Sequence, residues 1–324
     1  MKDLSIIVGF VNEYPQIVFT LRAIAESIGD ALNFEIIAVD NWCGEVSVQN
    51  RSPDEGHDRL NDKGELQQSR VAGAAKRLPW LRYLRYDEKL SHWNCKRVGV
   101  AAADSDTFLY MDAHVIPARD AIAEQFKWYN EFVGRDHVVH LPWTYQILDD
   151  RFQTYKLIDE RAVGNVTYTL TGYDKAAAEP YEVPCMSACG LMMSRTVLDR
   201  LGGWPPELGI YGGGEHFVNF VGAVLGVKKF IKPGRGFFHL GMKRGYHWNW
   251  SDYQRNRGIA SYLYGGEEYL RRHLDHKYGD KETVKAVIAE GIVGPCAAHR
   301  QWVLDHQTEE IDSWLDRWTN SGSI

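Results

Sequence analysis

Apolar and polar residues form regular blocks along the first part of the chain. Leu4–Phe10 and Phe34–Val39 are apolar almost throughout, which is typical of strands buried on both faces of a sheet. Between them, Gln16–Ile28 repeats its apolar residues at the spacing of one helix face. A strand, a helix and a second strand at this spacing form a βαβ unit, which predicts a parallel sheet covered by helices.

The same pattern continues to a strand that ends in polar side chains. Leu81–Arg85 favours a short strand, and Ser91–Ala103 favours a helix. Phe108–Asp112 is a further buried strand, and His114 follows Asp112 by two positions, on the same side of an extended chain. Open α/β sheets bind ligands at the carboxyl ends of their strands. Asp112 and His114 are therefore candidate metal ligands, and a plain polar turn is the alternative.

The second half of the chain changes character twice. Val138–Asp174 alternates aromatic and polar residues, which predicts an antiparallel ribbon outside the parallel sheet. Three later segments have helical periodicity: Ile259–Leu274, Lys281–Glu290 and Ala298–Trp318. We therefore expect an α/β fold with a mostly parallel sheet flanked by helices, a small antiparallel ribbon and a helical C-terminal region. The expected domains are residues 1–258 and a helical extension, 259–324.

Composition narrows the classes of protein that fit the chain. A length of 324 residues with 44% apolar and 25% charged residues is that of an ordinary globular protein. Five cysteines without a Cys-x-x-Cys pair favour reduced thiols over a disulfide framework. The first apolar run is too short for a signal peptide, and no run approaches the roughly 20 apolar residues that cross a membrane. We therefore expect a cytoplasmic protein that does not bind membranes.

Charge is unevenly distributed along the chain. The formal net charge of −6 argues against a protein that coats nucleic acid without specificity. The stretch Lys228–Arg257 nevertheless holds eight Lys and Arg residues against one acid, Asp252, and intersperses them with aromatic residues. Such a stretch favours a groove for a phosphate backbone and unstacked bases. Binding of the phosphates of a small ligand is the alternative.

Several short motifs, in a consistent order, resemble those of GT-A glycosyltransferases, which use nucleotide-sugar donors. The segment Cys95–Gly99, which ends thirteen residues before Asp112, resembles their Ala-Arg-Asn-x-Gly helix. Asp112-Ala113-His114 is similar to the Asp-x-His motif of retaining polypeptide N-acetylgalactosaminyltransferases. Three later segments resemble segments of the same enzymes: Met186–Met192, Leu201–Glu215 and Gly236–His239. The resemblance covers roughly residues 4–42 and 90–260, and it extends to the catalytic domain alone.

The resemblance implies a metal site and a donor site. Asp112, His114 and His239 would hold Mn²⁺ or Mg²⁺, which acts as a Lewis acid on a departing nucleoside diphosphate. A core histidine satisfied by hydrogen bonds is the alternative for His239. The expected donor-binding residues, with Asp40 at the uracil, are Phe10, Glu13, Asp40, Lys96, Gly190, Lys243, Arg244 and Tyr246. A solvated basic loop is the alternative for Lys243 and Arg244. The expected acceptor-binding residues are Trp143, Trp248 and Trp250.

Glu215 and His216 are the catalytic candidates. In inverting relatives the residue after the glutamate is an aspartate, the base that deprotonates the acceptor, whereas retaining relatives have asparagine there. His216 occupies this position, so the resemblance implies a retaining reaction in which Glu215 orients the acceptor or the sugar. The alternatives are His216 as the base, through the ordinary pKa of histidine, and Glu215 as a residue that only complements a helix dipole.

These motifs predict a metal-dependent glycosyltransferase that moves a sugar from a UDP-sugar to a hydroxyl acceptor, which can be a glycan, a protein or a modified DNA base. One alternative is a DNA-modifying glycosyltransferase that acts on hydroxymethylated bases, which it would have to flip out of the helix. An inactive nucleotide-sugar-binding protein is another. The sequence leaves the sugar, the acceptor and the oligomeric state open.

Overall fold

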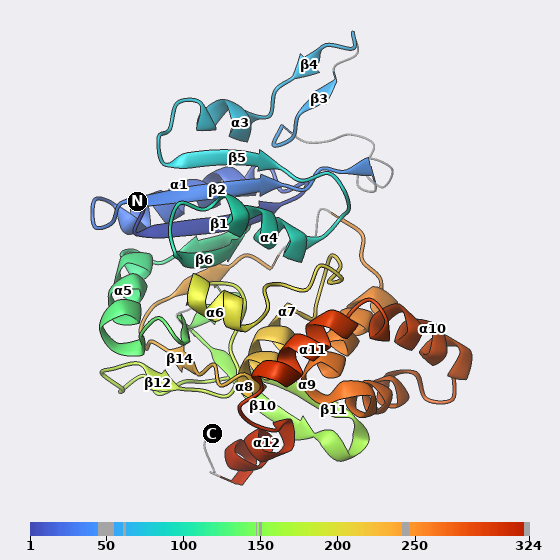
Figure 1. Ribbon diagram of the computed structural model, residues 1–324. Coiled ribbons are helices and arrows are strands. Elements are labelled where there is room, and N and C mark those ends of the chain that lie inside the picture. Colours follow the sequence, from blue (N-terminus) through green and yellow to red (C-terminus); the bar gives the residue numbers. More distant parts are fainter. Residues whose placement is uncertain (45–54, 61–62, 147, 149–150, 242–245, 321–324) are drawn as a thin grey trace.

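The chain folds around one large sheet of eight strands. The computed structural model describes residues 1–324 except 45–54, 61–62, 147, 149–150, 242–245 and 321–324. The strands of the large sheet are β1 (Leu4–Phe10), β2 (Phe34–Asp40), β5 (Leu81–Arg85), β6 (Thr107–Asp112), β8 (Val138–His140), β12 (Tyr181–Glu182), β13 (Leu191–Ser194) and β14 (Lys229–Ile231). They lie in the order β12-β14-β8-β13-β6-β1-β2-β5 (Figure 1).

Most of the pairings in this sheet are parallel, as predicted. The strands β6, β1, β2 and β5 are parallel to their neighbours within that group, and β8 is parallel to β14. The strands β13 and β12 run antiparallel to the strands beside them. Because β1, β2 and β6 are parallel, their carboxyl ends meet at one edge, where open α/β sheets bind ligands.

Three smaller sheets complete the β structure. A hairpin joins β10 (Thr154–Glu160) to β11 (Asn165–Thr171), and β7 (Val115–Pro117), β15 (Phe237–His239) and β9 (Trp143–Thr144) form a three-stranded sheet. The strands β3 (Arg59–Leu60) and β4 (Leu66–Gln67) pair with each other. The three-stranded sheet is important for the site because it brings β15 beside the chain that leaves β6.

Helices cover both faces of the large sheet. The α-helices are α1 (Gln16–Ile28), α3 (Arg70–Ala75), α4 (His92–Ala102), α5 (Ala121–Trp128), α6 (Arg195–Arg200), α7 (Gly214–His216), α8 (Gly222–Val224), α9 (Trp250–Tyr278), α10 (Glu282–Val293), α11 (Ala297–His306) and α12 (Ile311–Asn320). Shorter helical turns are η1 (Tyr129–Val133), η2 (Arg161–Val163) and η3 (Phe217–Val221). The C-terminal helices, orange to red in Figure 1, lie together beside the β10–β11 hairpin.

Burial on both faces explains why the central strands are apolar without alternation. In β1, Ile6 and Val8 belong to the core that packs on α1 and α5, whereas Ile7 belongs to the core that packs on α4 and α9. In β6, Leu109 and Tyr110 divide between the same two cores. Successive side chains of a strand point to opposite faces, so both sets must be apolar when helices cover both faces.

The predicted elements of the first third match the structure closely, and two later predictions need correction. Val138–His140 was expected in the antiparallel ribbon but lies in the large sheet, parallel to β14. The ribbon itself is confirmed as the β10–β11 hairpin. Ala298–Trp318 forms two helices, because the chain leaves helical geometry after His306 and resumes it at Ile311.

The predicted boundary between residues 258 and 259 lies inside α9, which has its one non-helical residue at Gly266. The cysteines of the chain are all free thiols and all buried. Among the described residues, no helix combines the length and the apolar character that crossing a membrane requires.

Candidate active site

A cavity of about 190 Å³ lies at the carboxyl ends of β1 and β6. Its walls come from the end of β1, the first turns of α4, the turn after β6, residues 187–189, residues 210–215, the end of β15 and the start of α9. Segments that are up to about 240 residues apart in the sequence thus meet at the edge of the sheet that the βαβ pattern predicts.

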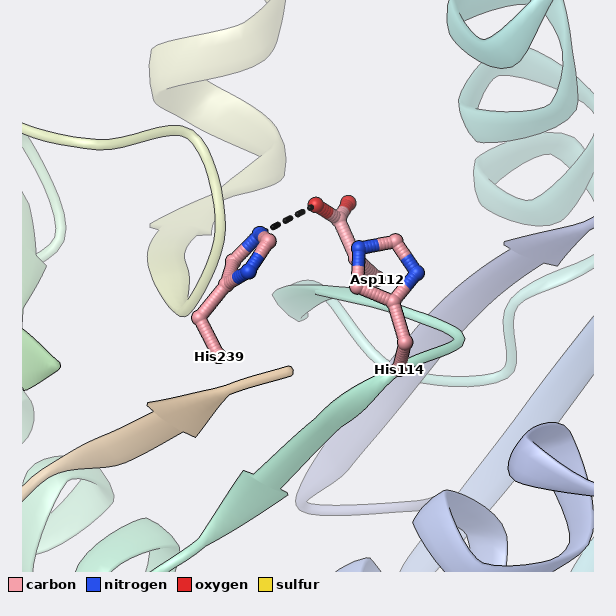
Figure 2. A group of neighbouring side chains, drawn as sticks. All are labelled: Asp112, His114 and His239. Carbon is pink, nitrogen blue, oxygen red and sulfur yellow. Dashed lines mark ion pairs between the residues drawn. The ribbon is translucent and has the colours of Figure 1, made fainter. Parts of the chain in front are cut away.

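Asp112, His114 and His239 turn their side chains toward one space within this cavity (Figure 2). Asp112 ends β6, His114 lies in the turn before β7, and His239 ends β15. Because β15 pairs with β7 so that His239 lies opposite Val115, the register places His239 beside His114. One ligand atom from each of the three residues lies within 4.8 Å of the others. The three predicted ligands are therefore brought together.

The surroundings of these side chains fit a divalent cation. Nδ1 of His114 donates a hydrogen bond to Oε1 of Glu13 at 2.6 Å, which orients the ring and gives Nε2 the lone pair for a metal. Nε2 of His239 lies 3.6 Å from Oδ2 of Asp112, and its buried Nδ1 has no hydrogen-bond partner among the described residues. A carboxylate and two imidazoles suit Mn²⁺ or a related ion. His239 therefore differs from a core histidine whose ring nitrogens are both hydrogen-bonded.

Asp112 lies among groups that favour its ionised form. Burial raises its pKa, but the interaction with His239 and the charges of His92 and Lys96 outweigh burial and hold the pKa well below 3.8. Nε2 of His92 lies 3.4 Å from Oδ1 of Asp112. The carboxylate is therefore ionised at neutral pH, as a metal ligand must be.

His92 is a site residue that the sequence reasoning missed. It begins α4 and lines the cavity together with Lys96, which follows it by four positions. Residues at i and i+4 lie on the same helix face, so the spacing within the predicted helix already placed His92 on the same face as Lys96.

Lys96 lies in the wall of the cavity with its side chain almost completely buried. Its Nζ lies 4.1 Å from the ring centroid of Trp93, a favourable cation–π distance. Burial lowers the pKa of Lys96, while the charges of Asp112 and Glu215 act in the opposite direction. The side chain of Lys96 is therefore near enough to both carboxylates for their charges to act on it.

Glu215 lines the cavity at the start of α7, after a run of glycines. Only glycine fits at Gly214, because an added Cβ would lie 1.9 Å from the ring of Trp93. This close approach, and a hydrogen bond of 3.0 Å from Nε1 of Trp93 to the carbonyl oxygen of Gly212, fix the start of the helix. The carboxylates of Glu13 and Asp112 contact His114 and His239, respectively. Glu215 is the remaining carboxylate among the residues that line the cavity.

His216 does not share the cavity with Glu215. Its side chain is buried outside the lining, where Nε2 lies 3.2 Å from Oγ1 of Thr167 and the ring packs against Tyr168. Burial and the charge of Arg257 hold the pKa of His216 well below 6.5. The structure thus does not bring His216 into the cavity with Glu215, because consecutive residues of a helix point in different directions, and its catalytic role stays a prediction.

Asp40 also lies outside the cavity lining, although it ends β2 as predicted. Its buried carboxylate accepts hydrogen bonds from the amide of Trp42 at 2.9 Å and from the hydroxyl of Tyr83, and lies 2.5 Å from Nδ1 of His57. The ring of His57 stacks on Phe10, which does line the cavity, with centroids 5.4 Å apart. Asp40 thus supports the wall behind Phe10 through His57, and its contact with uracil stays a prediction.

Gly190 lies beside the cavity lining but is not part of it. It has φ 75° and an added Cβ would lie 2.1 Å from the ring of Phe237, while its neighbours 187–189 line the cavity. Trp143 and Tyr246 line the cavity. Trp248 does not, although it packs on Tyr211, which does.

Trp250 is also outside the lining, 56% exposed and stacked on Tyr253. The predictions for Lys243 and Arg244 lie outside the described residues.

Several basic residues of the stretch Lys228–Arg257 make structural contacts in the part of the chain that the structure describes. Nζ of Lys229 is buried and donates to the carbonyl oxygen of Asn219 at 2.9 Å, and Lys232 pairs with Glu124 at 2.8 Å. Arg255 donates to two backbone carbonyls, and Arg257 is buried. These four basic residues thus serve separate structural contacts, while Lys243 and Arg244 of the same stretch lie outside the described residues.

No protein-family model matches the sequence, and no curated protein matches it. Solved structures do match the fold. GalNAc-T7 in complex with UDP, GalNAc and Mn²⁺ matches 98% of this chain with a TM-score of 0.73 and 15% identity. The match covers 56% of the GalNAc-T7 chain, so the present chain spans little more than half of that length.

Two further structures match less closely. TarS 1–349 of S. aureus in complex with UDP-GlcNAc has a TM-score of 0.52 and 12% identity over 97% of this chain and 84% of that chain. The mannosyltransferase PcManGT of Pyrobaculum calidifontis with GDP-Man and Mn²⁺ has a TM-score of 0.50 and 17% identity over 100% of this chain and 76% of that chain. The chain therefore has the GT-A fold of nucleotide-sugar glycosyltransferases.

Proposed function

We propose that this protein is a metal-dependent glycosyltransferase that moves a sugar from a UDP-sugar to a hydroxyl group of an acceptor. The observation that carries the proposal is the convergence of Asp112, His114 and His239 in the cavity of a GT-A fold. Two of the similar structures hold Mn²⁺ together with a nucleotide or a nucleotide sugar. The intact ligand group, with Glu215 in the same cavity, favours an enzyme over an inactive nucleotide-sugar-binding protein.

Each wall of the cavity has a role in this proposal. A divalent cation held by Asp112, His114 and His239 would supply Lewis acidity to the departing nucleoside diphosphate. Glu13 orients His114, and Lys96, when protonated, would stabilise the charge that develops on the leaving group beside Asp112. Phe10 provides an aromatic surface at the end of β1, where the resemblance places the nucleotide.

We assign a retaining reaction to this site. The bond between the anomeric carbon and the β-phosphate oxygen breaks, and a bond from the acceptor oxygen to that carbon forms on the same face. The acceptor proton passes to the departing phosphate oxygen. Glu215 orients the acceptor or the sugar, and the burial of His216 outside the cavity is in keeping with a reaction that uses no histidine base.

The acceptor would approach across the aromatic residues around the mouth of the cavity. Trp143 lies in the lining, and Trp248 and Trp250 extend an aromatic cluster away from it through contacts with Tyr211 and Tyr253. Partly exposed aromatic faces of this kind suit the apolar face of a sugar ring.

A panel of UDP- and GDP-sugars, assayed for Mn²⁺-dependent hydrolysis and transfer, tests the proposal. We expect turnover with a UDP-sugar, its loss in EDTA, and its loss in Asp112→Ala, because the cation then lacks its one carboxylate ligand. Asp136→Ala, at an exposed acid far from the lining, is the matched control. Full activity in EDTA would contradict the metal role, and an inverted product in NMR would contradict retention alone.

A further inference from the structure

The β10–β11 hairpin presents two tyrosines to the cavity. Tyr155 pairs with Leu170 and Leu157 pairs with Tyr168, so the two tyrosines lie diagonally on one face of the hairpin. Their ring centroids are 4.4 Å apart, and both side chains line the cavity. The hairpin is thus a wall of the site and not a remote appendage of the sheet.

Some tyrosines elsewhere in the chain use their hydroxyl group in a hydrogen bond to a described residue, and this pair does not. The hydroxyl of Tyr129 donates to a backbone carbonyl at 3.3 Å, and that of Tyr269 donates to Asp312 at 2.7 Å. Tyr155 and Tyr168 make no side-chain hydrogen bond with any residue that the structure describes. Both side chains are partly buried, and phenols that face the cavity without a partner among the described residues are available to hydrogen-bond a polar ligand.

The position of the pair indicates which part of a ligand it would meet. The ring of Trp143 contacts both Tyr155 and His239. Its centroid lies 5.6 Å from that of Tyr155 and 5.9 Å from that of His239. Tyr168 packs on α7, the helix that carries Glu215. The pair therefore lies between the metal group and the catalytic candidate, where the reacting sugar must lie if the proposed function holds.

We propose that Tyr155 and Tyr168 form a sugar-recognition wall that hydrogen-bonds ring hydroxyls of a saccharide in the reacting position. This inference rests on the proposed glycosyl transfer and names the residues that select for a sugar. A phenol both donates and accepts a hydrogen bond, as a sugar hydroxyl does, and the aromatic ring suits the apolar face of a pyranose.

The chemical state of the pair agrees with this role. Burial, followed by the charge of Glu215, raises the pKa of both phenols well above 10. The phenols therefore keep their protons at neutral pH and can donate a hydrogen bond.

The hairpin is also held in place from behind. Arg161, at its turn, forms ion pairs with Asp159 at 2.6 Å, with Asp312 at 2.9 Å and with Asp316 at 2.8 Å. The last two acids belong to α12, so the C-terminal helices anchor the end of the hairpin. A recognition surface on an anchored element keeps its geometry, which lowers the ordering cost of binding.

The test measures sugar recognition separately from nucleotide recognition. Wild type, Tyr155→Phe and Tyr168→Phe are titrated calorimetrically, with Mn²⁺ present, with UDP and GDP and with UDP-GalNAc, UDP-GlcNAc and GDP-Man. Acceptor KM is then measured with the methyl glycosides of the same three sugars. Tyr262→Phe is the matched control, because Tyr262 is buried outside the cavity and makes no side-chain hydrogen bond with a described residue.

We expect each cavity variant to weaken one sugar interaction about three- to tenfold, the range for one lost hydrogen bond. Weaker binding of the sugar nucleotide with unchanged binding of UDP or GDP assigns the wall to the transferred sugar. Unchanged donor binding with a raised acceptor KM assigns it to an acceptor sugar. If both variants match Tyr262→Phe in every titration and in KM, the assignment is overturned. Wild-type protein that binds none of the nucleotides would instead contradict the proposed function itself.

Discussion

Lys229 offers a test of how this fold places charge in its interior. Lys229 is the first residue of β14 and is 2% exposed. Its Nζ donates to the carbonyl oxygen of Asn219 at 2.9 Å and lies 4.8 Å from the ring centroid of Trp314. Burial, partly opposed by Cys185 and Glu182, lowers the pKa of Lys229 from 10.5 to about 8. A lysine that is easier to deprotonate in the folded state makes stability depend on pH.

The sign and size of the effect follow from proton binding. Because the folded pKa is below the unfolded pKa, the unfolded chain binds more protons between pH 8 and 10.5, and stability rises with pH in that window. The full difference corresponds to about 3 kcal/mol, of which about 2 kcal/mol appears between pH 7 and 9.5. Lys229→Met removes the titrating group and keeps the length and the contact with Trp314.

Urea unfolding of wild type and Lys229→Met at pH 7 and 9.5 provides the measurement. We expect the stability of the wild type relative to the variant to increase by about 2 kcal/mol at the higher pH, because other titrating groups cancel in the difference. Lys228→Met is the control, since the side chain of Lys228 is 55% exposed and stays hydrated in the folded state. A wild-type-to-variant difference that stays constant with pH, or changes in the opposite direction, refutes the reasoning.

Three other substitutions test the backbone, the catalytic assignment and the hairpin. Gly190→Ala should lower the free energy of unfolding by about 3 kcal/mol, because φ is 75° and an added Cβ would lie 2.1 Å from a ring. Gly203→Ala is the control, since φ is 78° there but no atom lies within 4 Å of an added Cβ, so only the backbone strain should destabilise the fold. Glu215→Gln should lower the chemical rate more than tenfold and leave the donor affinity nearly unchanged. His216→Ala should keep the pH profile of the rate in stopped-flow assays. Loss of that pH profile in His216→Ala would make the histidine the base. Arg161→Ala should speed amide hydrogen exchange across β10 and β11, because the ion pairs to α12 are lost; unchanged protection would show that packing alone holds the hairpin.

The local elements and the nearby ligands were predictable from the sequence. Apolar runs and helical spacing placed β1, α1, β5 and β6 within a residue of their observed ends, because these signals lie within short windows. Asp112 and His114 were paired by their spacing in one segment, and the order of distant motifs added His239 through a resemblance. Local spacing did not show that His216 points away from the cavity, since adjacency in the sequence does not imply the same direction on a helix.

Only the tertiary structure decided which side chains meet. The register of β15 against β7 puts His239 beside His114, about 125 residues away, and the docking of the hairpin puts Tyr155 and Tyr168 beside Glu215. Asp40 is buried against His57, and Lys229 and Lys232 of the basic stretch contact different parts of the fold. Periodicity fixes the face of an element, but the face alone does not determine its partner. That choice depends on strand register, helix docking and the free energy of burying polar groups, which are set by contacts between residues far apart in the chain.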